Sequence, residues 1–115
     1  MVTILEEIGI PVKYHHHEVG GPGQQEIETP LLGILKAGDA SMMIKYITKM
    51  TAFYENLSIT FLPKPLFGEA GNGMHFHQQI RKGNTNVFFD PAADNLLSEI
   101  ALFYIGGLLY HAPAL

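Results

Sequence analysis

The feature that most constrains the fold is a segment rich in proline and glycine, residues 61–77, near the middle of the chain. Pro63 and Pro65 lie close together in it, and three glycines follow within the same segment. Proline fixes its own φ and has no backbone N–H, and glycine accepts positive φ, so neither a helix nor a central strand continues through such a segment. The pattern therefore predicts a strand at Ser58–Leu62, a loop, and a second strand at Gly73–Arg81.

The second of these strands carries a His-x-His pair. Side chains alternate along a strand, so His75 and His77 are expected to face the same way, roughly 6–7 Å apart, and to share one polar site. Such a pair alone is more often surface or packing than a pair of ligands. A binding role therefore depends on further polar residues that meet it.

Those residues lie in a cluster nearer the N-terminus. Two strand-like runs, 14–18 and 24–28, flank the segment Gly20–Gly23, whose glycines and proline can turn the chain back on itself. Glu18 and Glu26 are then expected on opposite arms of a hairpin. Five of the six histidines fall in this cluster and in the His-x-His pair, which indicates that the two clusters carry the function.

Apolar residues recur at helical spacing in three stretches: residues 2–8, 32–57 and 93–110. The second stretch is clearest as a helix over Asp39–Asn56, with Asp39 as the expected N-cap. Met42, Met43 and Met50 are expected in the core, as is the third helix, whose apolar run is too short to cross a membrane.

Composition limits the classes of function. The 115 residues allow one domain, and 47% hydrophobic against 16% charged residues indicates surface that further chain or other subunits would cover. A formal charge of −4 gives no basic face for nucleic acid. The absence of cysteine excludes disulfides and thiolate metal sites. We expect no nucleic-acid partner, no membrane association and, without a signal-peptide pattern, a cytoplasmic location.

Taken together, the motifs resemble the catalytic domain of bacterial-type glutamine synthetase. The matching segments, which cover nearly the whole chain, are His16–Val19, Gly23–Ile27, Thr60–Gly68, Gly71–His77 and Leu97–Gly107. The family enzyme is several times longer. The resemblance therefore implies that residues 1–115 are part of the catalytic domain, without the N-terminal β-grasp domain and the C-terminal part of the catalytic domain.

The fold that the resemblance implies is α+β. Mostly antiparallel strands would form a sheet with the two main helices on one side, as part of the guanido-kinase-like catalytic domain of the family. Family enzymes are rings with active sites between subunits, so the parent protein is expected to be a homo-oligomer.

The resemblance also implies roles for individual residues. Residues that match Glu18 and Glu26 hold one divalent ion, and the residue that matches His75 helps to hold a second. His77 matches a residue that contacts ATP, and Gly71 matches one that contacts glutamate. Carboxylate ligands suit Mg²⁺ or Mn²⁺, and an imidazole favours Mn²⁺.

Four further positions belong to the comparison with the family, and three of them depart from its pattern. His16 is assigned beside the nucleotide. Gln79, also assigned to ATP binding, stands where the family often has serine. Ala70, in the glutamate site, replaces an asparagine, and Lys13 stands where the family has an acidic residue that contacts the nucleotide.

The implied reaction is that of an ATP-dependent ligase of nitrogen metabolism. ATP, a substrate here, phosphorylates the side-chain carboxylate of glutamate, and ammonia displaces phosphate from γ-glutamyl phosphate to give glutamine. Metal charge and positioning dominate such chemistry, so we expect no catalytic protein nucleophile. The sequence contains a single arginine, Arg81, and we expect no glutamine formation by the 115-residue chain itself.

Two alternatives remain open. One is a free-standing divalent-metal-binding module built on the His-x-His pair, which would need a carboxylate where Arg81 stands. The other is a non-catalytic interaction fragment that keeps the fold and docks on full-length subunits.

Overall fold

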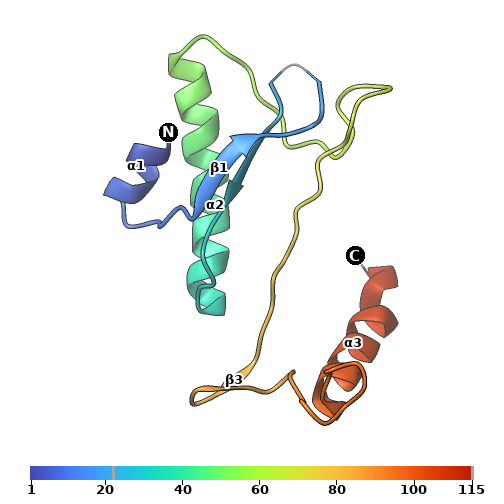
Figure 1. Ribbon diagram of the computed structural model, residues 1–115. Helices are drawn as coiled ribbons and strands as arrows, with labels where there is room; N and C mark the ends of the chain where they lie inside the picture. Colours follow the sequence, from blue (N-terminus) through green and yellow to red (C-terminus); the bar gives the residue numbers. More distant parts are fainter. Residues whose placement is uncertain (22, 115) are drawn as a thin grey trace. The chain divides into compact units, whose positions relative to one another are not determined.

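The computed structural model describes residues 1–21 and 23–114, which form two compact units, Met1–His75 and Phe76–Leu115 (Figure 1). Pro22 of the predicted turn lies outside the described residues. Both units combine a helix with a small antiparallel sheet. The α+β class is therefore confirmed at this level.

The first unit has its core where two helices meet. Helix α1 (Val2–Glu7) ends at the predicted glycine, because Gly9 adopts a φ of 85° and the Ile10 N–H returns to the Leu5 carbonyl at 2.9 Å. Leu5, Ile10 and Ala40 form the buried cluster, with half-buried apolar side chains around it.

The predicted hairpin of the first unit is confirmed. Strands β1 (Tyr14–His17) and β2 (Gln25–Glu28) pair antiparallel, and His16 lies opposite Glu26. A further backbone hydrogen bond, from the Glu18 N–H to the Gln24 carbonyl at 3.0 Å, extends the ladder toward the turn. Glu18 and Glu26, two of the three metal ligands expected from the sequence, thus lie at the turn end of the ladder.

The long helix of the first unit, α2, is also confirmed, although its start was predicted too late. It spans Ile34–Tyr54, with Gly33 rather than Asp39 at the N-cap. Gly33 is extended, with φ −60° and ψ 144°, and its carbonyl accepts from the Ala37 N–H at 2.9 Å. Asp39 therefore lies inside the helix, where its side chain has no capping role.

The strands predicted at 58–62 and 73–81 are wrong over most of their length. Residues 55–80 contain no strand, and only Arg81 begins one. A strand is stabilised by a paired ladder, and a short run without a partner strand does not hold an extended ladder geometry. The segment instead closes on itself, because the Asn72 N–H donates to the Pro63 carbonyl at 2.7 Å.

In the second unit, strands β3 (Arg81–Lys82) and β4 (Thr85–Asn86) form a tight hairpin. Gly83, with a φ of 59°, makes the predicted turn. The extended piece expected at 86–89 is confirmed only in part: it supplies the end of β4 and an isolated bridge between Phe89 and Leu97.

Helix α3 (Glu99–His111) follows, and a short 3₁₀ turn at Ala112–Ala114 ends the described chain. Helix α3 begins at Glu99 rather than near residue 93, where the sequence predicts its start. The side chains of Asp90 and Asn95 accept hydrogen bonds from nearby backbone N–H groups. Such local bonds stabilise turns, so the residues before Glu99 do not form helix.

The expectation of one sheet with both helices on one side is not met. The described residues form two sheets of two strands each, one in each unit. Sheets this small cover little apolar surface. Among the described residues, the buried hydrophobic ones are Leu5, Ile10, Ala40, Ala52 and Ala101.

The expectation of buried helices is corrected by the same measurements. Met42 is 71% exposed and Phe103 is 70% exposed, while Met50 is half-buried. Helix α3 buries Ala101 but leaves most of its large apolar side chains exposed. In the described part of the chain, no helix combines the length and apolarity that crossing a membrane requires.

Candidate functional site

The turn end of the β1–β2 hairpin gathers one imidazole and two carboxylates. Each of His16, Glu18 and Glu26 offers a ligand atom, and these atoms lie within 4.8 Å of one another. The strand register explains the grouping. His16 lies directly opposite Glu26, and Glu18 follows His16 by two residues, which places both on the same face.

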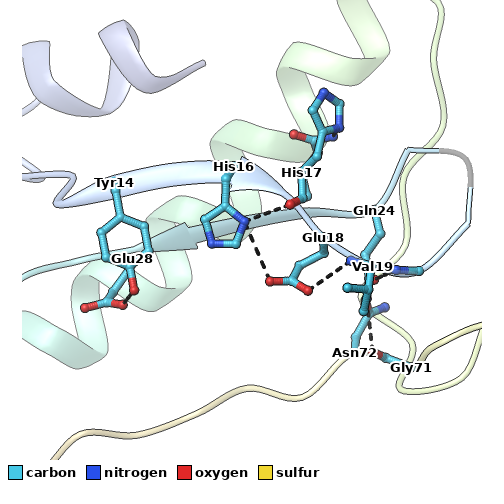
Figure 2. A network of polar contacts seen from close by, with 11 residues as sticks. Tyr14, His16, His17, Glu18, Val19, Gln24, Glu28, Gly71 and Asn72 are labelled. Atoms are coloured by element: carbon cyan, nitrogen blue, oxygen red, sulfur yellow. Dashed lines mark hydrogen bonds and ion pairs between the residues drawn. The ribbon is translucent and has the colours of Figure 1, made fainter.

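Glu18 is held in a form suited to bind a cation. Its Oε2 accepts a hydrogen bond from the Val19 N–H at 3.1 Å, which Figure 2 shows as a dashed line. This bond lowers the pKa of Glu18 most, the neighbouring Glu26 side chain lowers it further, and the charges of His16 and His75 add to the effect. An ionised carboxylate at neutral pH follows.

His16 faces that carboxylate. Its Nδ1 lies 3.7 Å from Glu18 Oε1 and 2.8 Å from the His17 carbonyl oxygen (Figure 2). The bond to the His17 carbonyl raises the pKa of His16 most, and the carboxylates of Glu18, Glu26 and Glu28 raise it further. In the neutral ring a proton on Nδ1 serves the His17 carbonyl and leaves the Nε2 lone pair for a ligand.

The imidazole in this group is His16, whereas His75 is predicted to help hold a second ion. His75 lies close enough to Glu18 to lower its pKa, yet within the described residues the three-member group contains His16 instead. The cross-strand register would have identified His16, because any hairpin that brings Glu18 and Glu26 together also places His16 beside them. The contact between His16 and the nucleotide stays a prediction.

The residues predicted to contact glutamate lie beside the hairpin turn. Gly71 presents its carbonyl to the Gln24 side chain, whose Nε2 donates to it at 3.0 Å (Figure 2). Ala70 lies next to Gly20, since a Cβ built on Gly20 would be 3.2 Å from the Ala70 Cβ. The loop and the metal-ligand candidates thus belong to one neighbourhood within the first unit.

Two predicted ATP-binding residues lie in the second unit. His77 and Gln79 are both exposed, in a segment without strand pairing. The boundary between the units falls after His75, so the structure does not place His75 and His77 as neighbours on one strand. Because residues 73–80 form no strand, strand alternation does not support a shared site for His75 and His77, and the shared site stays a prediction.

The other end of the hairpin is closed by a different polar group. Lys13 Nζ lies 2.5 Å from Glu28 Oε1, and the Tyr14 hydroxyl donates to the second oxygen of Glu28 (Figure 2). The hydrogen bond to Glu28 is the main reason that the pKa values of Lys13 and Tyr14 are raised. Lys13, at a position where the family has an acidic residue, is thus engaged with the chain's own carboxylate.

Comparison with known proteins identifies the family. The family model described as the catalytic domain of glutamine synthetase matches residues 1–115. The chain belongs to the glutamine synthetase family. The resemblance read from the sequence motifs is thereby confirmed.

Individual relatives agree in extent but not all in name. A glutamine synthetase of Mycolicibacterium smegmatis is 45% identical over all 115 residues, and one of Frankia alni is 44% identical over the same length. A protein of Cupriavidus pinatubonensis named 3-hydroxylaminophenol mutase is also 44% identical over 115 residues. The chain spans 24% of the length of each of these three relatives.

Ligand sets of oxygen atoms with one nitrogen hold divalent metals such as Mg²⁺ and Mn²⁺. The residues of the hairpin fit such a metal. Two carboxylates and one imidazole, each offering a ligand atom within 4.8 Å of the others, form a mixed oxygen and nitrogen ligand set.

Proposed function

We propose that this chain forms part of the metal and substrate site of a glutamine synthetase. The parent enzyme would form glutamine from glutamate and ammonia with ATP, through γ-glutamyl phosphate. The observation that carries the proposal is the group His16, Glu18 and Glu26, within 4.8 Å, inside a chain matched throughout to the family's catalytic domain.

In this proposal the hairpin carboxylates hold the metal. Glu18 and Glu26 bind one Mg²⁺ or Mn²⁺, and His75 helps to bind a second. His16, His77 and Gln79 contact ATP, with His16 near enough to share the first ion. A bound divalent ion would neutralise phosphate charge and align the γ-phosphate with the glutamate carboxylate.

The chain's own residues prepare this chemistry by charge and position. The lowered pKa of Glu18 keeps its carboxylate ionised, so no proton has to leave before a cation binds. Gly71 and Ala70 would line the glutamate site, where Ala70 offers a methyl group instead of an amide. A protein nucleophile has no part in the proposed reaction.

The requirement for glycine at position 71 has a structural origin. A Cβ there would lie 2.5 Å from the Pro63 carbonyl oxygen, a contact that would force the loop open. The glycine therefore permits the closed loop itself, and the proposed contact with glutamate uses the backbone that this loop presents.

The wider context of the parent enzyme belongs to the same proposal. We infer a cytoplasmic homo-oligomeric ring that acts in glutamine biosynthesis. The exposed apolar surface of α2 and α3 supports the view that further chain or subunits cover this piece.

A non-catalytic role is the second candidate, and the same exposed surface favours it. Phe103, Leu109 and Tyr110 on α3 are 70%, 71% and 80% exposed. A fragment with such a helix could dock on full-length subunits without turning over substrate. Binding of metal by the hairpin would then be retained as a remnant of the family fold, or the chain would serve as a free-standing metal-binding module.

Metal binding by the 115-residue chain tests the primary proposal. Mn²⁺ is titrated into the wild type and into Glu18→Gln and Glu26→Gln, and free Mn²⁺ is followed by electron paramagnetic resonance. Each variant removes one charged ligand, so we expect affinity to fall about ten-fold or more. Glu55→Gln, the same charge change just after α2, serves as the matched control and should bind like the wild type.

Equal Mn²⁺ affinity in the wild type and in both hairpin variants would overturn the assignment of Glu18 and Glu26. A loss of affinity in Glu55→Gln as large as in the hairpin variants would do the same, because the effect would then follow net charge rather than coordination.

A further inference from the structure

Gln24 joins two segments that are far apart in the sequence. Its side-chain Oε1 accepts a hydrogen bond from the Gly20 N–H at 2.7 Å, inside the hairpin turn. Its Nε2 donates to the Gly71 carbonyl at 3.0 Å and to Asn72 Oδ1 at 2.8 Å. One amide group thus binds the turn with its acceptor and the 62–72 loop with its donor.

The backbone of the same residue holds a metal-ligand candidate. The Gln24 carbonyl accepts from the Glu18 N–H at 3.0 Å. Figure 2 shows Gln24 between Glu18 on one side and Asn72 and Gly71 on the other. Gln24 therefore contacts the Glu18 backbone through its own carbonyl and the loop through its side chain.

The loop that Gln24 grips is closed and has defined ends. Asn72 donates from its side chain to the Leu62 carbonyl and from its backbone N–H to the Pro63 carbonyl, both at 2.7 Å. A second link to the turn comes from Glu69, whose Oε2 accepts from the Gly21 N–H at 2.8 Å. The loop is therefore closed by its own hydrogen bonds, and Gln24 and Glu69 attach it to the hairpin turn.

We propose that Gln24 is a positioning residue that holds the 62–72 loop beside the turn end of the hairpin, so that Gly71 and the Glu18 carboxylate keep a fixed relation. The proposal rests on the proposed function for the ligands that are aligned, glutamate at the loop and a divalent cation at the hairpin. The clamp itself is defined by the contacts alone.

The chemistry of the clamp explains why the residue is glutamine. The position needs an acceptor toward the Gly20 N–H and a donor toward the Gly71 carbonyl, and a primary amide supplies both. A glutamate side chain has the same length and keeps the acceptor, but it would direct an oxygen at the Gly71 carbonyl and at Asn72 Oδ1. A methionine side chain has similar length and offers neither contact.

These differences define the experiment. Hydrogen exchange of backbone amides is measured in the 115-residue chain for the wild type, Gln24→Glu and Gln24→Met, with and without Mn²⁺. The amides of Lys13 and Glu18 report the hairpin ladder, and the amide of Asn72 reports the loop. Gln25→Met is the matched control, because Gln25 contacts the His17 ring at 2.5 Å rather than the loop.

We expect Gln24→Glu to speed exchange at Asn72 about three- to ten-fold while the hairpin amides exchange as in the wild type. Mn²⁺ should slow loop exchange in the wild type and in Gln25→Met, and should slow only hairpin exchange in Gln24→Glu. This metal-dependent response of the loop is the readout that separates positioning from a general loss of stability.

Each other outcome counts against the proposal. Wild-type loop exchange in Gln24→Glu would show that the clamp does not hold the loop. Faster hairpin exchange in both Gln24 variants would make the residue a stabiliser of the hairpin instead. If Mn²⁺ binds none of the proteins, the proposed function fails, whereas the metal-free comparison at Asn72 still decides whether Gln24 holds the loop.

Discussion

Glu18 and His16 shift each other's protonation because they face one another at the turn end of the hairpin. The folded-state pKa of Glu18 lies below its ordinary value of 4.5, chiefly through the Val19 N–H. The folded-state pKa of His16 lies above its ordinary value of 6.5, chiefly through the His17 carbonyl. Both shifts favour the charged forms, and the two charges are of opposite sign.

The pH range of this stabilisation follows from the two directions. The Glu18 contribution is present above about pH 4.5 and is lost as pH falls through the folded-state pKa. The His16 contribution is present below about pH 6.5 and is lost as pH rises through the folded-state pKa. The two therefore act together between these values.

Removing the Glu18 charge should lower the pKa of His16. In Glu18→Gln the bond to the His17 carbonyl remains, so we expect the His16 titration midpoint to move to lower pH without losing the whole elevation. The midpoint is measured from the ring proton resonances by NMR. Glu7→Gln, a like charge change on α1, should leave it in place. A midpoint that is unchanged or higher in Glu18→Gln would show that the carboxylate does not act on the imidazole.

Among the elements, α3 depends most visibly on one side chain at its start. Ser98 Oγ accepts from the Ala101 N–H at 3.1 Å and donates to the Val87 carbonyl at 2.6 Å. It thus caps the helix and also ties it to the segment that follows β4. This double role fixes the start of α3 at Glu99, after the turns held by Asp90 and Asn95.

Replacing Ser98 by alanine should destabilise α3 by about 1 kcal/mol, the usual cost of losing an N-cap side chain. The loss is measured as faster hydrogen exchange of the first-turn amides of α3 and as reduced helical circular dichroism. Ser41→Ala is the control, because Ser41 lies inside α2 and its hydroxyl bonds to the Ala37 carbonyl. That substitution should be neutral or slightly stabilising. If Ser98→Ala destabilises its helix no more than Ser41→Ala does, the capping role of Ser98 is ruled out.

The elements that sequence reasoning found are those whose signals are local. Glycines at the turn made the β1–β2 hairpin predictable, and the apolar period made α2 predictable. The strands expected at 58–62 and 73–81 were not formed because a strand needs a partner, which a local pattern cannot reveal. The apolar pattern predicts a helix from about residue 93. The side-chain hydrogen bonds of Asp90 and Asn95 stabilise turns there instead, so α3 begins only at Glu99.

The same distinction applies to the candidate site. Glu18 and Glu26 were expected to approach each other across the hairpin, and the structure places their carboxylates together. Their metal-binding role stays a prediction. His16 joins them because the register of the two strands decides which imidazole meets the carboxylates, and a motif taken by itself does not show that register.

At the scale of the whole molecule, the chain has more apolar surface than its small sheets can cover. Few of the described residues are both buried and hydrophobic, and large apolar side chains along α2 and α3 remain exposed. The chain also spans only 24% of relatives such as the M. smegmatis glutamine synthetase. Both facts are consistent with a catalytic-domain segment whose remaining contacts come from other chain.

Catalysis by the 115-residue chain is therefore not expected. The hairpin group described here supplies three ligands, and affinity and geometry of a divalent ion depend on the number of ligands. Phosphoryl transfer between anionic reactants also needs fixed cations, and the sequence contains one arginine, Arg81, which donates to the Asn84 carbonyl. We expect glutamine formation from ATP, glutamate and ammonia with Mn²⁺ to stay at the background of a protein-free control. The full-length M. smegmatis relative is the positive control. If the 115-residue chain forms glutamine and Glu18→Gln abolishes that activity, the chain forms a complete site and the expectation is wrong.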